Sequence, residues 1–286
     1  MVNHTDFPEK KIGLVLGGGG ARGLAHIGII KVLEEAGITI SHLAGCSMGG
    51  LIASLYASGM PISEIEGIAL SLNNTREILK LVDHTPSRKG LLAGKSIRKF
   101  LSRFIPTEYT IENTKIPLVL NAVDLNTGRE IELREGSLLD SIMATTAVPG
   151  FFPAVDRGPY RLVDGGMLDD VPVKYLKSIS PIPVVAVDVH LHLQETALAG
   201  GSSNHEHIPL PLPVFMQDFY NVEMIMTTTF IKINLEKYPP DLLVRPTIPA
   251  DISLFFGFLK VRDIIQAGED AMREKLPILH SLLQLK

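Results

Sequence analysis

The sequence predicts one α/β domain with helices on both sides of a mostly parallel sheet. Short apolar runs alternate with helical patterns, a glycine-rich turn follows the first run, and a Gly-x-Ser-x-Gly turn follows the second. Alternation of strand, helix and strand is typical of layered α/β folds. A chain of 286 residues with 45% apolar and 6% aromatic residues is long enough for one large soluble domain.

Composition argues against several classes of function. The net charge is −4 and the 27 Lys and Arg residues are scattered, so no nucleic-acid-binding surface is expected. The single cysteine, Cys46, excludes an internal disulfide and a multi-cysteine metal site, and it suits a reducing compartment. Met1 to Lys11 is polar and lacks the apolar core of a signal peptide, so we expect a cytoplasmic protein.

The first half of the chain begins with a strand, a glycine turn and a helix. Ile12 to Leu16 reads as a buried strand, the helix after the turn reaches about Glu35, and Ile38 to Ala44 reads as the second strand. Helices are expected at Pro61 to Leu72, Thr75 to Leu81, Ser96 to Phe104 and Ser137 to Ala147, and strands at Ile116 to Val123, Glu130 to Leu133 and Arg161 to Val163.

The second half continues the same alternation without an internal repeat. Gln194 to Pro213 is rich in Gly, Ser, Pro and His and lacks periodicity, which predicts a mobile loop. Helices are expected at Val173 to Ser178, Val214 to Phe230 and within Gly257 to Glu274, and strands at Val184 to Val189 and Leu242 to Arg245. Residues 178–286 are therefore expected to continue the same α/β domain.

The Gly45-Cys46-Ser47-Met48-Gly49 stretch has the pattern of a nucleophile elbow. In such an elbow a serine occupies a strained turn between a strand and a helix, and the flanking glycines are needed because a Cβ would collide with the crossing chain. The preceding apolar run and the following small-residue helix provide that context. By itself the motif is weak evidence, because a turn without chemistry has the same pattern.

Ester hydrolysis by Ser47 would need donors for the oxyanion and a base for the serine proton. The glycine turn ends a strand and opens a helix, so the amides of Gly18, Gly19 and Gly20 are candidates for an oxyanion hole. Arg22 either adds charge there or anchors the turn to a carboxylate. Asp164 is the candidate base, because it ends a strand and precedes two glycines that allow a close backbone approach. The alternative for Asp164 is a turn or a helix cap.

The chain contains three motifs in sequence order: Gly18-x-Gly20-x-x-Gly23, Gly45-x-Ser47-x-Gly49 and Asp164-Gly165-Gly166. Their order and spacing resemble those of the patatin-like phospholipases, and the resemblance covers residues 12–177. The resemblance implies a three-layer helix-sheet-helix fold and a catalytic Ser47-Asp164 dyad without histidine. It implies lipid acyl esters as substrates, with no cofactor and no metal such as calcium. The motif residues that would support the dyad are Arg22, Gly23, Gly45, Gly49, Gly165 and Gly166.

Several alternatives stay open on the sequence alone. His190 and His192 follow a strand downstream of Asp164, where a Ser-His-Asp esterase would place its base. A pseudoenzyme that binds a lipid or a partner would keep the same motifs. Leu254 to Phe258 reads as core, or as an apolar membrane contact if exposed.

The remaining polar residues have simpler expectations. His26 reads as a satisfied core histidine, Asp169 and Asp170 read as a helix start, and His205, Glu206 and His207 read as part of a polar loop. Met143 and Thr145 stand where many members of the family have Arg and Ser, which leaves substrate preference open.

Overall fold

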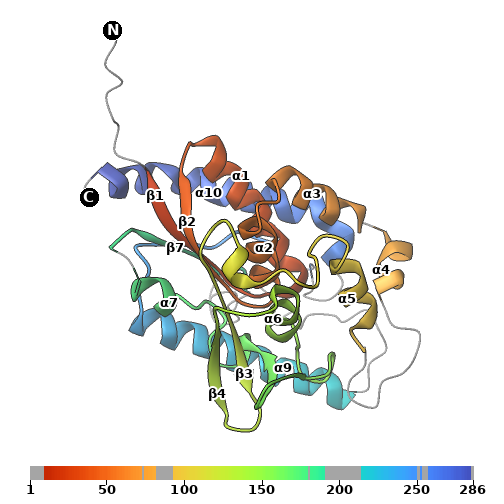
Figure 1. Cartoon of the computed structure of the whole chain (residues 1–286). Helices are drawn as coiled ribbons and strands as arrows, with labels where there is room; N and C mark the ends of the chain where they lie inside the picture. Colours follow the sequence, from red (N-terminus) through yellow and green to blue (C-terminus); the bar gives the residue numbers. More distant parts are fainter. Residues whose placement is uncertain are drawn as a thin grey trace.

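The computed structural model describes residues 10–72, 74–81, 93–179, 181–190, 214–249, 252 and 257–284. Within them the strands form one sheet in the order β5-β6-β3-β2-β1-β7-β8, with β4 also paired to β3 (Figure 1). The strands are β1 Lys11–Leu16, β2 Thr39–Gly45, β3 Leu118–Asp124, β4 Arg129–Leu133, β5 Val155–Arg157, β6 Tyr160–Asp164, β7 Val184–Val187 and β8 Leu242–Val244.

Strands β3, β2, β1, β7 and β8 run parallel to one another, whereas β4 and β6, which also pair with β3, run antiparallel to it. β1 pairs with β2 on one side and with β7 on the other, so the turns that follow these three strands lie at the same edge of the sheet. This edge is where open parallel sheets place their ligand sites.

Helices cover both faces of the sheet. The α-helices are α1 Ala25–Glu35, α2 Ser47–Ala57, α3 Ile62–Ser71, α4 Thr75–Leu81, α5 Lys95–Leu101, α6 Leu138–Thr145, α7 Lys174–Lys177, α9 Val214–Lys237 and α10 Val261–Gln284. Short 3₁₀ helices lie at η1 Gly20–Leu24, η2 Ile111–Asn113, η3 Gly165–Met167 and η4 Gly257–Lys260. The predicted α/β architecture is therefore confirmed.

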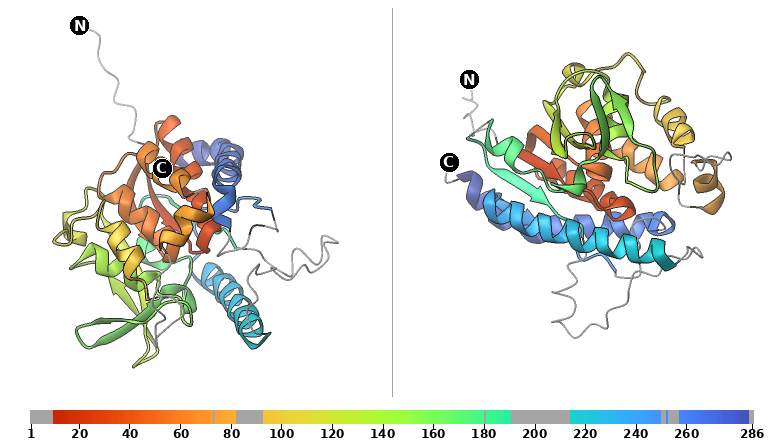
Figure 2. Two further views of the ribbon diagram at one scale, coloured as in Figure 1. Left: turned by 90° about the vertical axis from the view of Figure 1, so that its right-hand side faces the viewer. Right: turned by 90° about the horizontal axis from the view of Figure 1, so that it is seen from below.

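Successive residues of β1 pack into different layers, as the alternation of a strand requires. Leu14 and Leu16 belong to a large core formed with α1, α2, α3, α6 and α10. Val15 belongs to a smaller core on the other face, where α7 contributes Leu176 and α9 contributes Ile231. Figure 2 shows α9 as a long helix separate from α10.

Two glycines allow α1 and α10 to pack with their backbones in contact. A Cβ on Gly28 would lie 2.1 Å from the carbonyl oxygen of Ile265, and a Cβ on Gly268 would lie 2.0 Å from that of Ala25. Lys31 of α1 also forms ion pairs with Glu66 of α3 and Glu269 of α10. The last helix of the described chain is thereby fixed against the first.

Some elements differ from the sequence prediction. β5 was not predicted, α9 continues past Phe230 to Lys237, and α10 continues past Glu274, through Pro277, to Gln284. Leu279 is fully buried, so packing holds α10 beyond the proline. The expected helix start at Asp169 and Asp170 is wrong, because α7 begins at Lys174 and both carboxylates are buried.

Two predicted features lie outside the described residues. They are the loop from Gln194 to Pro213 and most of the Leu254 to Phe258 run, of which Phe258 is partly buried against the core. Among the described helices, none has the length and apolar character needed to cross a bilayer.

Candidate active site

Ser47 occupies the strained turn that the elbow motif predicts. Its φ is 50°, and it is the one non-glycine residue of the described chain with a positive φ. Such a conformation is unfavourable for a residue with a Cβ and persists only where the surrounding structure enforces it. A Cβ on Gly49 would lie 2.2 Å from the carbonyl oxygen of Leu16, and one on Gly45 would lie 2.8 Å from the Cα of Gly50. Both glycines are therefore required sterically.

The backbone of the elbow is held by α6. The amide of Ser47 donates a hydrogen bond of 3.0 Å to Oγ1 of Thr145, which is fully buried near the end of α6. A buried amide without an acceptor would be costly, so Thr145 fixes both the position and the orientation of the first turn of α2. The sequence singled out Thr145 only as a departure from the family pattern, because no local signal links it to residue 47.

Asp164 lies at the end of β6, beside the elbow. Its Oδ1 accepts a hydrogen bond of 2.8 Å from the amide of Gly166 and a longer one of 3.5 Å from Sγ of Cys46. Burial, reinforced by the negative charge of Asp170, raises the pKa of Asp164 to about 7, against the opposing effect of hydrogen bonds from Gly166, Ser47 and Cys46. A buried carboxylate that lines the same cavity as the serine of the elbow and has this pKa is suited to general-base chemistry near neutral pH.

The residues of the glycine turn have two different surroundings. The amide of Gly18 donates to the carbonyl oxygen of Asp170 at 3.2 Å and to its Oδ2 at 2.9 Å. Gly19 and Gly20, with φ values of 123° and 53°, line the cavity that contains Ser47. Of the three predicted oxyanion donors, the structure thus places Gly19 and Gly20 at the cavity and turns the amide of Gly18 toward Asp170.

The other motif residues serve as supports. Nε of Arg22 donates to the carbonyl oxygen of Val189 at 2.8 Å, and Nη1 donates to that of Ile252 at 3.2 Å. Arg22 therefore anchors the glycine turn to backbone carbonyls. A Cβ on Gly23 would lie 2.6 Å from Cγ of Met48, and one on Gly165 would lie 2.4 Å from Oδ1 of Asn121. Close packing accounts for both glycines. A Cβ on Gly166 would lie 2.5 Å from Oδ1 of Asp170.

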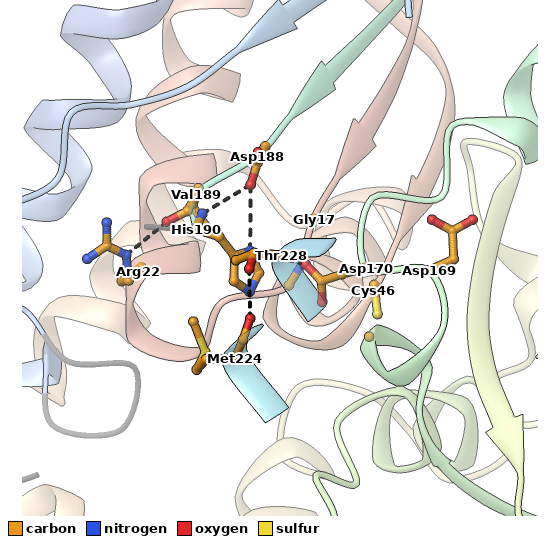
Figure 3. Close-up of polar contacts among 12 residues, drawn as sticks. Gly17, Arg22, Cys46, Asp169, Asp170, Asp188, Val189, His190, Met224 and Thr228 are labelled. Carbon is orange, nitrogen blue, oxygen red and sulfur yellow. Dashed lines mark hydrogen bonds and ion pairs between the residues drawn. The ribbon is translucent and has the colours of Figure 1, made fainter. Parts of the chain in front are cut away.

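A buried charge network lies behind the glycine turn (Figure 3). Nδ1 of His190 lies 3.3 Å from Oδ2 of Asp170 and 3.6 Å from Oδ1 of Asp188, and Oδ2 of Asp188 lies 3.0 Å from Nε of Arg245. Burial lowers the pKa of His190, but the charges of Asp170 and Asp188 outweigh it and leave the pKa raised. Sequence reasoning missed the role of Asp170. Figure 3 shows Asp170 beside Cys46, while Asp169 lies apart.

The histidines fall into distinct environments. His190 lines the same cavity as Ser47, yet its polar contacts in the described chain are to Asp170 and Asp188. Nε2 of His26 lies 2.7 Å from the carbonyl oxygen of Gly17, and burial lowers the pKa of His26 to about 4, which identifies it as a core histidine. Its Nδ1 has no hydrogen-bond partner among the described residues, so the expected satisfied histidine is paired at one ring nitrogen. His192, His205 and His207 lie outside the described residues.

The cavity is small and partly closed by α9. Its volume is about 70 Å³, enough for two or so water molecules. The lining residues are Gly19, Gly20, Ser47, Val148, Asp164, Gly166, Met167, Asp170, His190, Glu223, Met224 and Thr227. The last three come from α9. The sequence predicted the helix but carried no signal that these residues belong to the site, since no motif surrounds them.

Within the described chain, one cluster of side chains could hold a metal ion: the ligand atoms of Cys46, Asp164 and Asp170 lie within 4.8 Å of one another. Burial and the surrounding carboxylates raise the pKa of the Cys46 thiol well above its usual range, so it is protonated at neutral pH. A protonated thiol is a poor ligand. These residues fit a proton-sharing cluster better than a metal site.

Comparison with known proteins assigns the chain to a family. The sequence profile described as Patatin-like phospholipase matches residues 14–177, more than half of the chain. The chain belongs to the patatin-like phospholipase family. The resemblance noted in the sequence is therefore confirmed, and family membership supports lipid hydrolase chemistry at the level of the family as a whole.

Curated relatives match part of the chain. An uncharacterised NTE family protein of Mycobacterium tuberculosis is 36% identical over 172 residues, which is 60% of this chain and 47% of that protein. The neuropathy target esterase sws of Drosophila melanogaster is 29% identical over 193 residues, which is 64% of this chain and 14% of that protein. The matched segment thus spans less than half the length of these relatives.

Among solved structures, VipD from Legionella pneumophila is similar in fold. The TM-score is 0.51 with 15% sequence identity, and the match covers 97% of this chain and 67% of that chain. At this identity the similarity supports the fold alone.

Proposed function

We propose that this protein is a serine acyl hydrolase that cleaves carboxylic esters of lipids, with Ser47 as nucleophile and Asp164 as general base. The observation that carries the proposal is the conjunction of a strained Ser47 with an Asp164 whose pKa is raised to about 7. Both side chains line one cavity with Gly19 and Gly20. A lipid as the acyl donor is favoured by family membership.

The reaction would begin with proton transfer from Ser47 to the carboxylate of Asp164 as Oγ attacks the ester carbonyl. The amides of Gly19 and Gly20 would donate to the oxyanion of the tetrahedral intermediate, and each such donor is typically worth about 3 kcal/mol. Asp164 would then protonate the departing alcohol, leaving an acyl group on Ser47. In the second half, Asp164 would deprotonate a water molecule that hydrolyses the acyl-enzyme.

The buried charges around Asp164 explain how a carboxylate could serve as this base. An exposed aspartate has a pKa near 3.9, too weak a base to take a serine proton efficiently. Burial together with the charge of Asp170 raises the pKa of Asp164 toward the working pH. The hydrogen bond from the amide of Gly166 keeps the carboxylate oriented toward the elbow. Burial therefore supplies the base strength, and Gly166 supplies the orientation.

A Ser-His-Asp esterase remains the second candidate, because His190 lines the cavity. The dyad is preferred because Ser47 and Asp164 line one cavity and Ser47 acts on the pKa of Asp164, whereas the ion pairs of His190 in the described chain are with Asp170 and Asp188. His192 stays part of that alternative. A lipid-binding or regulatory module is the third reading, and it predicts no turnover. Contact with a membrane surface and a cytoplasmic location stay predictions from the sequence.

The test is hydrolysis of a short-chain aryl ester by wild type, Ser47→Ala, Asp164→Asn and His190→Gln. Ser58→Ala is the matched control, because Ser58 follows the same helix and its hydroxyl donates to the carbonyl oxygen of Leu55. The dyad predicts no turnover for Ser47→Ala, a loss of at least about a hundredfold for Asp164→Asn, and measurable turnover for His190→Gln. Loss of all turnover in His190→Gln with near-normal Asp164→Asn would favour the triad.

A further inference from the structure

Glu223 of α9 is a cavity residue that the dyad mechanism does not use. It lines the cavity together with Ser47 and Asp164. Its Oε2 is buried and has no hydrogen-bond partner in the described part of the chain. Buried polar atoms are nearly always paired, so an unpaired carboxylate oxygen beside a nucleophile points to a partner that arrives with the substrate.

The charges around the cavity define which partner fits. Three carboxyl groups line it, those of Asp164, Asp170 and Glu223. Among the described lining residues, the side chain that can carry positive charge is His190, which pairs with Asp170. Burial, followed by the charges of Asp164 and Asp170, raises the pKa of Glu223 to about 7. The charge of His190 opposes this rise, but His190 lies in an ion pair with Asp170, so the carboxyl groups of the cavity outnumber its cations.

The mechanism assigns Glu223 to one half of the substrate. The oxyanion faces Gly19 and Gly20, while the leaving alcohol must depart past Asp164, which returns the proton to it. Glu223 and Asp164 line the same cavity of about 70 Å³, so Glu223 lies near the path of the leaving group. We propose that Glu223 forms a subsite for a positively charged ammonium group in the alcohol half of the ester. This inference rests on the proposed acyl hydrolase function.

The test uses three S-butyryl thioesters whose leaving thiols carry a positive charge, no charge or a negative charge, and it compares their relative rates between enzyme variants. The thiols are 2-(trimethylammonio)ethanethiol, its uncharged isostere 3,3-dimethylbutanethiol, and the anionic 2-mercaptoethanesulfonate. Released thiol is measured at pH 8, above the pKa of Glu223. Wild type should favour the cation over the isostere by about tenfold in kcat/KM, which corresponds to ~1.4 kcal/mol, and should favour the isostere over the anion.

Variants assign the preference to one residue. Glu223→Gln keeps the shape of the side chain and should lower the ratio of cation to isostere by about tenfold relative to wild type. Glu236→Gln makes the same change of charge at an exposed position of the same helix and should keep the wild-type ratio. Equal ratios in wild type and Glu223→Gln would overturn the subsite while leaving the hydrolase function intact. Absence of turnover for all three thioesters in wild type would overturn the hydrolase function and the subsite together.

A second arm distinguishes a lipid head group from a small ammonium ester. Fatty acid release is measured from mixed micelles of phosphatidylethanolamine or phosphatidylglycerol with identical acyl chains. A preference for the ethanolamine lipid that Glu223→Gln removes would identify a lipid head group as the source of the ammonium. A Glu223-dependent preference seen only with the thioesters would support the subsite and assign it to small ammonium esters.

Discussion

Replacing Gly49 by alanine should disrupt the elbow, because the new Cβ would meet the backbone and not a movable side chain. It would lie 2.2 Å from the carbonyl oxygen of Leu16 and 2.3 Å from that of Gly17. Relief requires a separation of about 1 Å between the first turn of α2 and the end of β1. That shift would stretch the hydrogen bond of 3.1 Å from the amide of Cys46 to the carbonyl oxygen of Leu16.

The expected cost follows from these contacts. Overpacking costs about 1–3 kcal/mol, and a lost hydrogen bond adds about 0.5–1.5 kcal/mol. Alanine regains about 0.5–1 kcal/mol of helix propensity, so Gly49→Ala should lose roughly 2 kcal/mol of unfolding free energy. Gly67 of α3 is the matched control, since no atom lies within 4 Å of its added Cβ. Gly67→Ala should gain about 0.5–1 kcal/mol.

Urea denaturation measures the unfolding free energy of both variants, provided that the m-value stays constant, and ester hydrolysis measures their activity. Gly49→Ala should unfold at lower urea and lose most activity, whereas Gly67→Ala should unfold at higher urea with normal activity. A Gly49→Ala protein as stable and as active as wild type would refute the steric account of the elbow.

Substitutions at three residues test the dyad and its surroundings. The folded-state pKa of Asp164, about 7, exceeds its usual 3.8, so the stability that the neutral carboxyl contributes is lost as pH rises from about 4 to 7. Because asparagine does not titrate, the unfolding free energy of Asp164→Asn relative to wild type should rise by at most ~4 kcal/mol between pH 4 and pH 8, as measured by urea denaturation at both pH values. Asp170→Asn removes a charge that raises the pKa of Asp164, so the acidic limb of its kcat/KM profile should move to lower pH; an unmoved limb would show that Asp170 does not tune the base. Thr145→Val leaves the amide of Ser47 without its acceptor and should lower the free energy of unfolding by about 1–3 kcal/mol. Thr145→Ser keeps the hydroxyl and should retain most stability and activity in urea denaturation and ester hydrolysis.

The parts of the site that sequence reasoning located are those encoded by local backbone chemistry. The glycines on either side of Ser47 mark a strained turn because no larger residue fits there. Asp164 could be found because two glycines follow it at a strand end. The central strands were found for a similar reason, since continuous apolar runs bounded by turns indicate buried parallel strands.

The parts that sequence reasoning missed depend on the tertiary fold. Asp170 looks like a helix start beside Asp169, and its role arises because the end of β1 brings the amide of Gly18 to it. Glu223 sits in a Met-rich helix with no motif, and it reaches the cavity because α9 crosses the site. β5, Val155–Arg157, is three residues long and too short to show a period.

The most direct test of the account is to locate the nucleophile. Wild type is treated with a fluorophosphonate probe, digested, and analysed by peptide mass spectrometry, beside Ser47→Ala, Asp164→Asn and His190→Gln. The account predicts a single adduct on Ser47 in wild type and in His190→Gln, none in Ser47→Ala, and much slower labelling in Asp164→Asn. An adduct on another residue, or labelling that persists in Ser47→Ala, would contradict it.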